Sequence, residues 1–283
     1  MNNNIIIHAL IPARGGSKSI PKKNVKIYKK YPLLVHSINV AKDISFISKI
    51  VVSTDCDEIK NIALKNGADV PFLRPSNISG DYSTDIECFQ HYISWLKVNK
   101  KKIPDIIVHL RPTYPERNND ILYKCLTKFI DIRDIYTSLR TVVPINKSLF
   151  KMYTIDSDKT LKPTYEVFNN IKEPYNQVRQ ILPITYLHNG CIDIINTKII
   201  ENGSISGDKI YPYIMEDNET YDIDTNDDWK RSLTENINSD SEEVEEFETI
   251  INNYNSLYTK SKPINIPISY LKNSKKNNYF NSY

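Results

Sequence analysis

Short apolar runs alternate with segments of helical spacing over the first half of the chain. Three runs are predominantly apolar, as buried strands of a parallel sheet are, at residues 5–11, 49–54 and 106–110. Helical spacing is found between and after them, at residues 32–43, 57–66, 84–96 and 120–130. This alternation predicts an α/β fold, with a mostly parallel sheet flanked by helices on both faces.

The pattern changes between about residues 142 and 185. Helical spacing is lost there, prolines interrupt the segment and aromatic residues recur, so we expect an inserted β-rich arm rather than an independent domain. Further strands are predicted around this insertion and after it, at residues 135–139, 186–195, 211–215 and 220–224, with Thr225 capping a helix. We expect one domain over residues 1–240, followed by an acidic helix and a polar tail over residues 241–283.

Length and charge limit the possible functions. The chain has 283 residues, which suits one large α/β domain with a small appendage. Its net charge of +3 is too small to indicate a nucleic-acid-binding protein. The four cysteines lie far apart and match no zinc spacing, so we expect reduced thiols in a cytoplasmic protein. The first apolar run is too short to span a bilayer and lacks a basic leader, so we do not expect a signal peptide.

A glycine pair and four cations follow the first predicted strand, in the stretch ARGGSKSIPKKN at residues 13–24. Gly15 and Gly16 can adopt positive φ and leave room for a ligand to touch the main chain. Successive N–H groups in such a turn can form a nest for an anion. The loop adds positive charge through Arg14, Lys18, Lys22 and Lys23. These features suit a triphosphate.

A basic glycine-containing loop can also be a solvated surface turn or part of a nucleic-acid patch. Neither of two common phosphate-loop patterns, G-x-x-x-x-G-K-[ST] and G-x-G-x-x-G, is present in the stretch. The loop alone therefore leaves these alternatives open.

Two acids form the second candidate site, at Asp222 and Asp224. On the predicted strand these side chains share a face, about 6.7 Å apart. Two such carboxylates can hold Mg²⁺, which completes its shell with water and phosphate oxygens. A solvated edge strand is the alternative. Asp55 and Asp57 form a rival pair, ranked lower because Asp57 already serves as a helix cap.

Two polar segments remain. Arg111 and Arg117 lie just beyond the predicted strand at residues 106–110, where open α/β sheets bind ligands, and either arginine can fork onto a carboxylate or phosphate. A stiff surface turn is the alternative there. Residues 179–190 bring further polar groups back toward the sheet, and a packed loop is the simpler interpretation of that segment alone.

Together these stretches resemble the acylneuraminate cytidylyltransferase family, the CMP-sialic acid synthetases and their relatives. Their order and spacing carry the resemblance, which covers most of residues 4–236. The matching residues are 11–18 (IPARGGSK), 21–24 (PKKN), 53–55 (STD), Arg74, Pro75, 111–113 (RPT), Pro115, Arg117, Arg179, Gln180, Asn189, Gly190 and 222–225 (DIDT).

The resemblance implies a Rossmann-like nucleotidyltransferase fold with an inserted dimerisation arm, hence a homodimer. It implies transfer of CMP from CTP to an acidic acceptor, a nonulosonic (sialic-like) acid, with release of pyrophosphate. By this analogy CTP contacts Arg14, Gly15, Gly16, Ser17, Lys23, Asn24, Arg74, Ser83 and Asp85. The acceptor contacts Arg111, Lys151, Arg179, Gln180, Tyr186 and Asn189. Mg²⁺ binds Asp222 and Asp224, and Lys23, Arg14 and Asp224 are the catalytic residues.

The chain departs from the family pattern in three places. Ser19 stands where a glycine is usual, and Arg111 where sialic acid synthetases have glutamine. An extra cation at Arg111 favours a more anionic acceptor, so a phosphorylated small molecule that gives a CDP-linked product is an alternative. In the arm, Phe150 and Lys151 match a His-Pro-Lys type segment only in part.

Two further functions stay open on the sequence. One is a non-catalytic module that binds nucleotides or nucleic acid through the basic loop. The other is a glycosyltransferase whose metal is held by Asp55 and Asp57.

Overall fold

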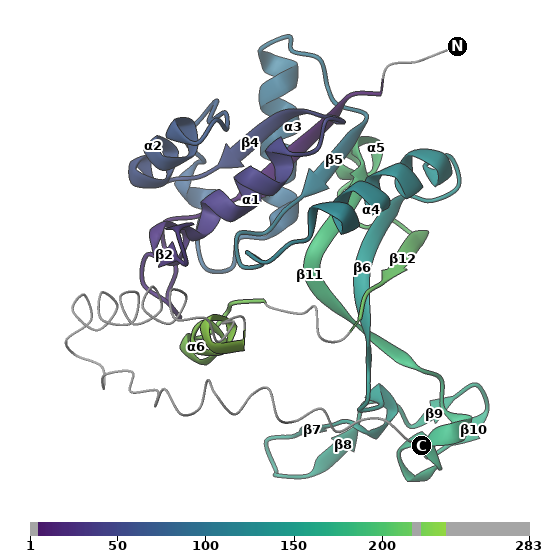
Figure 1. Cartoon of the computed structure of the whole chain (residues 1–283). Coiled ribbons are helices and arrows are strands. Elements are labelled where there is room, and N and C mark those ends of the chain that lie inside the picture. The colour runs from purple at the N-terminus through teal and green to yellow at the C-terminus, as the bar shows by residue number, and fades with distance from the viewer. Residues whose placement is uncertain (1–4, 217–221, 236–283) are drawn as a thin grey trace, which may run out of the picture.

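The computed structural model describes residues 5–216 and 222–235, and a six-stranded sheet forms the centre of this part of the chain (Figure 1). The strands lie in the order β12-β6-β11-β5-β1-β4. β1 runs parallel to β4 and β5, β12 runs parallel to β6, and β11 runs antiparallel to β5 and β6. The prediction of a mostly parallel sheet is therefore confirmed. The strands are β1 (Ile7–Pro12), β4 (Ile47–Ser53), β5 (Ile106–His109), β6 (Ser138–Ile145), β11 (Thr185–Asn196) and β12 (Ile210–Ile214).

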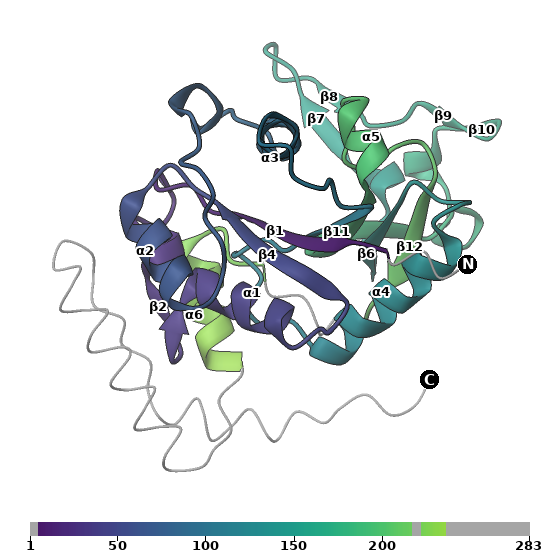
Figure 2. The same cartoon turned by 90° about the horizontal axis from the view of Figure 1, so that it is seen from above.

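Helices cover both faces of this sheet (Figure 2). One face packs against α1 (Leu33–Lys42), α2 (Asp57–Lys65) and α4 (Asn119–Ile132) in a cluster that includes Leu34, Ile59 and Leu126. The other face packs against α3 (Asp85–Val98) and α5 (Thr197–Glu201), where Phe89 and Ile200 are buried. Because both faces are covered, β1 is buried along nearly its whole length, which explains its continuous apolar sequence.

The loop after β1 leads into short elements that precede α1. They are a 3₁₀ turn at Lys23–Val25 and the two-residue strands β2 (Ile27–Tyr28) and β3 (Tyr31–Pro32). Helix α3 begins at the predicted capping box, in which Thr84 and Glu87 bond reciprocally. Helix α6 (Asn226–Glu235) ends the described part of the chain. None of the helices in the described ranges is long and apolar enough to cross a membrane.

An arm, defined here as residues 146–184, projects from the sheet between β6 and β11 (Figure 1). It contains the short strands β7 (Tyr153–Ile155), β8 (Leu161–Pro163), β9 (Val167–Phe168) and β10 (Ile171–Lys172). Phe150 packs against Tyr165 and Phe168, with ring centroids 5.2 and 4.4 Å away. The recurring aromatic residues of the sequence therefore form a small core inside this arm.

Two strand predictions differ from the structure. Residues 222–224 belong to no strand, because their backbone pairs with loops: Ile223 N–H donates to Thr113 O at 2.7 Å, and Ile223 O accepts from Lys23 Nζ at 2.9 Å. The strand predicted at residues 135–139 begins only at Ser138 and continues to Ile145. The helix and tail predicted for residues 241–283 lie outside the described residues.

Candidate active site

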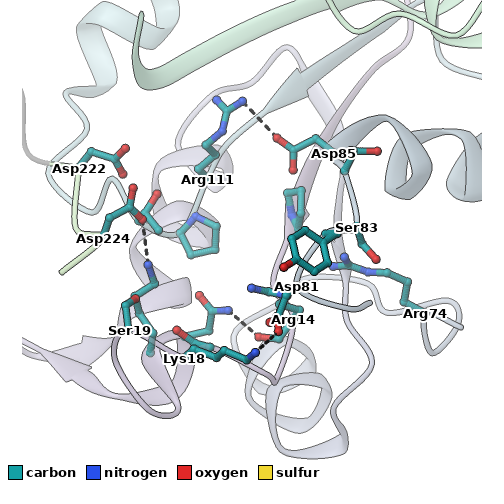
Figure 3. Close-up of a pocket in the computed structure, with 18 of the residues that line it drawn as sticks. Arg14, Lys18, Ser19, Arg74, Asp81, Ser83, Asp85, Arg111, Asp222 and Asp224 are labelled. Carbon is teal, nitrogen blue, oxygen red and sulfur yellow. Dashed lines mark hydrogen bonds and ion pairs between the residues drawn. The ribbon is translucent and has the colours of Figure 1, made fainter. Parts of the chain in front are cut away.

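A cavity of about 640 Å³ lies where β1, β4 and β5 end, at the carboxyl edge of the parallel strands. Its volume is in the range of small-molecule sites. Figure 3 shows Ser19 of the basic loop and the two acids on one side, facing Arg74 and Ser83 on the other, where Arg14 of the same loop also lies. The residues that line it are Pro12, Arg14, Ser17, Lys18, Ser19, Lys23, Asn24, Arg74, Asp81, Tyr82, Ser83, Thr84, Asp85, His109, Arg111, Pro112, Thr113, Asp222 and Asp224.

A glycine is needed at position 15 because the main chain there lies close to Cys56, and not because of its backbone dihedral angles. A Cβ on Gly15 would lie 2.9 Å from the Cβ of Cys56, while a Cβ on Gly16 would meet no described atom within 4 Å. Neither glycine uses the positive φ that it could adopt, and the positive φ of this loop falls on Lys22, at 55°. Ser19 has no positive φ either, so a side chain is tolerated there in place of glycine.

Asp55 has a structural role that excludes it as the preferred metal ligand. Its Oδ1 accepts the N–H of Gly15 at 2.8 Å and so holds the loop against the end of β4. Asp57 is the first residue of α2, where a negative charge is favourable. Asp55 and Asp57 therefore both stabilise the fold, and neither residue lines the cavity.

Two of the loop cations are bound to the turn that precedes α3. Arg14 donates from Nη1 to Gly80 O at 2.6 Å and to Asp81 Oδ1 at 3.1 Å. Lys18 pairs with Asp81 as well, and its hydrogen bond holds the pKa of that carboxyl below its usual value. Lys22 turns away to Glu58, 2.8 Å away. The Asp81 carboxylate thus forms ion pairs with both Arg14 and Lys18, the two loop cations next to this turn.

Lys23 connects the basic loop to the acidic pair. It is 8% exposed, and its Nζ donates to Ile223 O at 2.9 Å and to Asp224 Oδ1 at 3.1 Å. Asn24 supports the same loop by donating to Arg14 O at 2.9 Å. Since an ammonium group has three donors, one remains after these two bonds. The buried cation is therefore available to a ligand in the cavity.

Asp222 and Asp224 both line the cavity although they are not in a strand. Burial, and then the charge of Asp224, raise the pKa of Asp222, while a hydrogen bond from Thr113 opposes this. Ile223 between them is fully buried, so the carboxylates are fixed by packing as well as by Lys23. Within the described ranges, no group of three or more His, Cys, Asp or Glu side chains has the geometry of a metal site.

The residues predicted to read the cytosine lie on the opposite wall. Arg74 is 7% exposed and donates from Nη2 to Ser53 O at 2.5 Å, while its buried Nε has no hydrogen-bond partner among the described residues. Ser83 accepts the N–H of Gly80 at 2.9 Å. Asp85 is the first residue of α3 and reaches across to Arg111.

Arg111 is already paired with two carboxylates. Its Nη1 lies 2.7 Å from Asp193 Oδ2 and its Nη2 lies 3.3 Å from Asp85 Oδ2. The guanidinium therefore adds no uncompensated charge to the cavity. This removes the reason for expecting a more anionic, phosphorylated acceptor.

His109 and Asp193 belong to this site and were not predicted. Burial, followed by the charge of Arg111, lowers the pKa of His109 to about 3. Burial alone would raise the pKa of Asp193, but a hydrogen bond from His188 and the charge of Arg111 hold it below its usual value. The sequence did contain a sign of these two residues. Each is the single polar residue in an otherwise apolar run, IIVHL for His109 and CIDII for Asp193.

Arg117 was a candidate for binding an anion, with a stiff turn as the alternative, and in the structure it binds backbone and hydroxyl groups of the fold. It donates to the carbonyl oxygens of Cys191 and Tyr114, each at 2.6 Å, and to Ser37 Oγ at 2.8 Å. Burial lowers its pKa to about 10. It therefore ties the turn after β5 to β11 and does not line the cavity.

Five residues predicted to contact the acceptor are not brought to this cavity. Asn189 is buried, where its Oδ1 accepts from Thr141 Oγ1 at 2.7 Å. Arg179 and Gln180 line a second cavity, of about 410 Å³, near the base of the arm. Lys151 and Tyr186 lie in the arm and on β11 next to it.

The family is decided by sequence comparison. A model of the family described as Cytidylyltransferase matches residues 8–110. The CMP-N,N'-diacetyllegionaminic acid synthase of Legionella pneumophila is 34% identical over 238 residues, which are 82% of this chain and 95% of that protein. The chain belongs to the acylneuraminate cytidylyltransferase family. The prediction of this family from the motifs is thus confirmed.

Other relatives extend the comparison. The pseudaminic acid cytidylyltransferase of Campylobacter jejuni is 36% identical over 143 residues, which are 50% of this chain and 61% of that protein. The chain therefore spans less than two thirds of that relative's length in the alignment. A solved structure of CMP:2-keto-3-deoxy-manno-octonic acid synthetase with CTP has the same fold, with a TM-score of 0.56 at 15% identity over 80% of this chain and 96% of that one.

Proposed function

We propose that the chain is a CTP-dependent cytidylyltransferase that transfers CMP to a nonulosonic, sialic-like acid and releases pyrophosphate. One observation carries this proposal: Lys23 joins the basic loop to Asp224 inside a single cavity at the carboxyl edge of the sheet. The triphosphate and the reacting hydroxyl would then be held within reach of the same fixed cation. The names of the relatives support the same chemistry.

The reaction requires positioning and neutralisation of charge more than covalent chemistry by the protein. The acceptor hydroxyl oxygen bonds to the α-phosphorus of CTP, and the bond from that phosphorus to the bridging oxygen breaks. Pyrophosphate leaves with the electron pair, and the hydroxyl proton passes to solvent. Arg14 and Lys23 neutralise the phosphates, and the N–H of Gly16 and the hydroxyl of Ser17 bind their oxygens. Gly15, whose own N–H is held by Asp55, brings the main chain close to them, and Asn24 holds the loop in place.

The two acids fit a magnesium ion by their chemistry. Partial burial and the charge of Asp224 raise the pKa of Asp222, and a bound cation would oppose both effects by favouring its charged form. Two carboxylate oxygens, completed by water and phosphate oxygens, form a donor set that Mg²⁺ accepts. Asp222 and Asp224 would hold the ion, which would polarise a phosphoryl oxygen when bound.

The nucleobase and the acceptor are assigned to different ends of the cavity. Arg74 and Ser83 lie on the wall where we place the cytosine. Arg111 lies toward the acceptor end, and Asp85, which we also assign to the cytosine, lies between them and contacts Arg111 at 3.3 Å. Two carboxylates match the charge of Arg111, which suits an acceptor with a single carboxylate. No observation favours the phosphorylated acceptor or the non-catalytic module.

We also propose a homodimer formed through the arm. Large apolar side chains are exposed on and beside it, including Ile155 at 71%, Val178 at 62% and Ile184 at 70%. A surface of this kind normally meets a partner. The acceptor role proposed for Lys151 and Arg179 requires that a second copy bring its arm over the cavity. The molar mass in solution, measured by light scattering, tests the dimer.

The four cysteines are free thiols, which supports our proposal of a cytoplasmic enzyme.

An assay of pyrophosphate release tests the activity. The protein with Mg²⁺ is given each of the four nucleoside triphosphates together with nonulosonic acids or phosphorylated sugars. We expect turnover with CTP and a nonulosonic acid. Turnover only with phosphorylated acceptors would move the proposal to a CDP-linked product, and CTP binding without any turnover would refute the enzymatic function.

A further inference from the structure

Three polar side chains lie side by side on three adjacent strands behind the acceptor end of the cavity. Asp193 on β11 is the register partner of His109 on β5 and of Arg140 on β6. Ile107 lies two residues before His109 and Ile195 two residues after Asp193, so each shares a face of the sheet with its neighbour. Both isoleucines pack in the hydrophobic cluster under α3 and α5. The three polar side chains therefore lie on the face of the sheet that α3 and α5 cover. A charged residue at this place needs a partner, because the face is otherwise apolar.

Asp193 is held by two guanidinium groups, one on each carboxylate oxygen. Oδ2 accepts from Arg111 Nη1 at 2.7 Å, and Oδ1 accepts from Arg140 Nε at 2.7 Å. The carboxylate is only 1% exposed, so water does not compete for these bonds. His188 Nε2 lies 3.2 Å from Oδ1. Asp193 is thus a rigid anchor for the Arg111 side chain.

The second contact of Arg111 is weaker and closer to solvent. Nη2 lies 3.3 Å from Asp85 Oδ2, and the Asp85 side chain is 37% exposed against 1% for Asp193. An incoming carboxylate can therefore replace Asp85 on the outer edge of the guanidinium while Asp193 keeps its place. Guanidinium groups bind carboxylates through parallel hydrogen bonds, which suits such an exchange.

We propose that Asp193 is a positioning residue that presents Arg111 to the carboxylate of the acceptor, and that Asp85 is the internal carboxylate which the acceptor displaces. The inference rests on the proposed function, since it specifies how that acceptor is bound. Asp193 does not line the cavity, and among the side chains that do, Arg111 is the one to which it is hydrogen-bonded in the described part of the chain.

Arg140 offers a matched control. It binds the same carboxylate at the same distance as Arg111, but its Nη2 bonds to Ser206 Oγ at 3.0 Å and it does not line the cavity. Loss of Arg140 therefore disturbs the buried cluster without removing the anchor of Arg111. A purely structural role of Asp193 predicts equal effects of Asp193→Asn and Arg140→Gln.

The experiment compares N-acetylneuraminic acid with its methyl ester as acceptors in the full chain, with CTP affinity measured by calorimetry. Wild type should favour the acid. Asp193→Asn should raise KM for the acid by about tenfold or more, the usual effect of losing one charge-assisted contact, and lower the preference for acid over ester by a similar factor. CTP affinity should stay the same, and Arg140→Gln should keep the acid preference.

Coupling to Arg111 gives a second readout. In an Arg111→Gln background, Asp193→Asn should add almost nothing to KM for the acid, because the residue through which it acts is gone. If Asp193→Asn does not fold, Asp193→Glu, which keeps the charge but moves it outward, should lower the acid preference in the same way.

If the wild-type protein turns over CTP and a nonulosonic acid, any of four results would overturn this inference and leave the proposed function standing. They are an unchanged acid preference in the Asp193 variant, an equal loss in Arg140→Gln, additive effects in the double variant, and a fall in CTP affinity that accounts for the loss. Absence of wild-type turnover with CTP and any nonulosonic acid would overturn the proposed function and the inference together.

Discussion

Replacement of Lys23 by methionine removes the cation that connects the two halves of the cavity. The change keeps the length and apolar stem of the side chain and deletes only the ammonium group. In the structure this group is 2.9 Å from Ile223 O and 3.1 Å from Asp224 Oδ1. We expect a large loss of kcat, because the charge that develops on the leaving pyrophosphate loses a preorganised partner.

The magnitude follows from the position of the ammonium group. A cation about 4 Å from a phosphate charge near a protein surface interacts by about 4 kcal/mol. Only the part that grows in the transition state affects kcat, and loss of one such donor typically lowers kcat by about 10²–10³. Stability falls as well, by about 1–3 kcal/mol, because the buried carbonyl of Ile223 loses its donor.

The assay is steady-state pyrophosphate release, with urea unfolding to confirm that the variant is folded. Lys26→Met is the matched control, because Lys26 is a cation of the same loop region that packs over Trp229, 4.6 Å from the ring centroid, and does not line the cavity. We expect its kcat to stay within about threefold of wild type, as for a cation outside the site. A folded Lys23→Met protein with near wild-type kcat would refute the role given to Lys23.

Three further predictions concern the same site. Asp81→Asn frees Lys18 from an internal carboxylate, so the Kd for CTP measured by calorimetry at low salt should fall by about two- to fivefold, and an equal or larger Kd would contradict this. Burial lowers the pKa of His109 to about 3, so on acidification the unfolded chain takes up this proton first. The free energy of unfolding should therefore fall by about 1.6 kcal/mol from pH 6.5 to pH 5. His109→Leu should lose that part of the pH dependence in urea unfolding, and an unaltered slope would show that other groups cause it. Gly15→Ala should destabilise the chain by about 1–3 kcal/mol, because its Cβ meets a neighbour at 2.9 Å, whereas Gly16→Ala should be nearly neutral, and equal effects in thermal unfolding would refute the packing argument.

The family motifs and the α/β alternation could be predicted from the sequence because each depends on residues that are close together along the chain. A buried strand of a covered sheet is apolar along its whole length, and the capping box of α3 lies within four residues. Both signals need only neighbouring residues. The same holds for the basic loop, whose cations and glycines are adjacent in sequence.

The roles of individual polar residues were decided by contacts between distant segments. Asp55 and Arg117 looked like candidate ligands, yet each is used by the fold, one to hold Gly15 and the other to bind backbone carbonyls. Arg111 looked like a free cation, but two carboxylates match its charge. A motif shows which groups are present and not which partners they meet.

The acidic segment shows this division most clearly. The pair Asp222 and Asp224 was visible in the sequence, and a strand was the natural expectation for it. In the structure these residues face the cavity without any strand, because Lys23, 200 residues away along the chain, binds the Ile223 carbonyl between them. Sequence alone determined the type of fold, the family and the chemical groups at the site. Only the tertiary structure decided which of these groups meet, because a hydrogen bond across that separation depends on the packing of the whole sheet and leaves no local pattern.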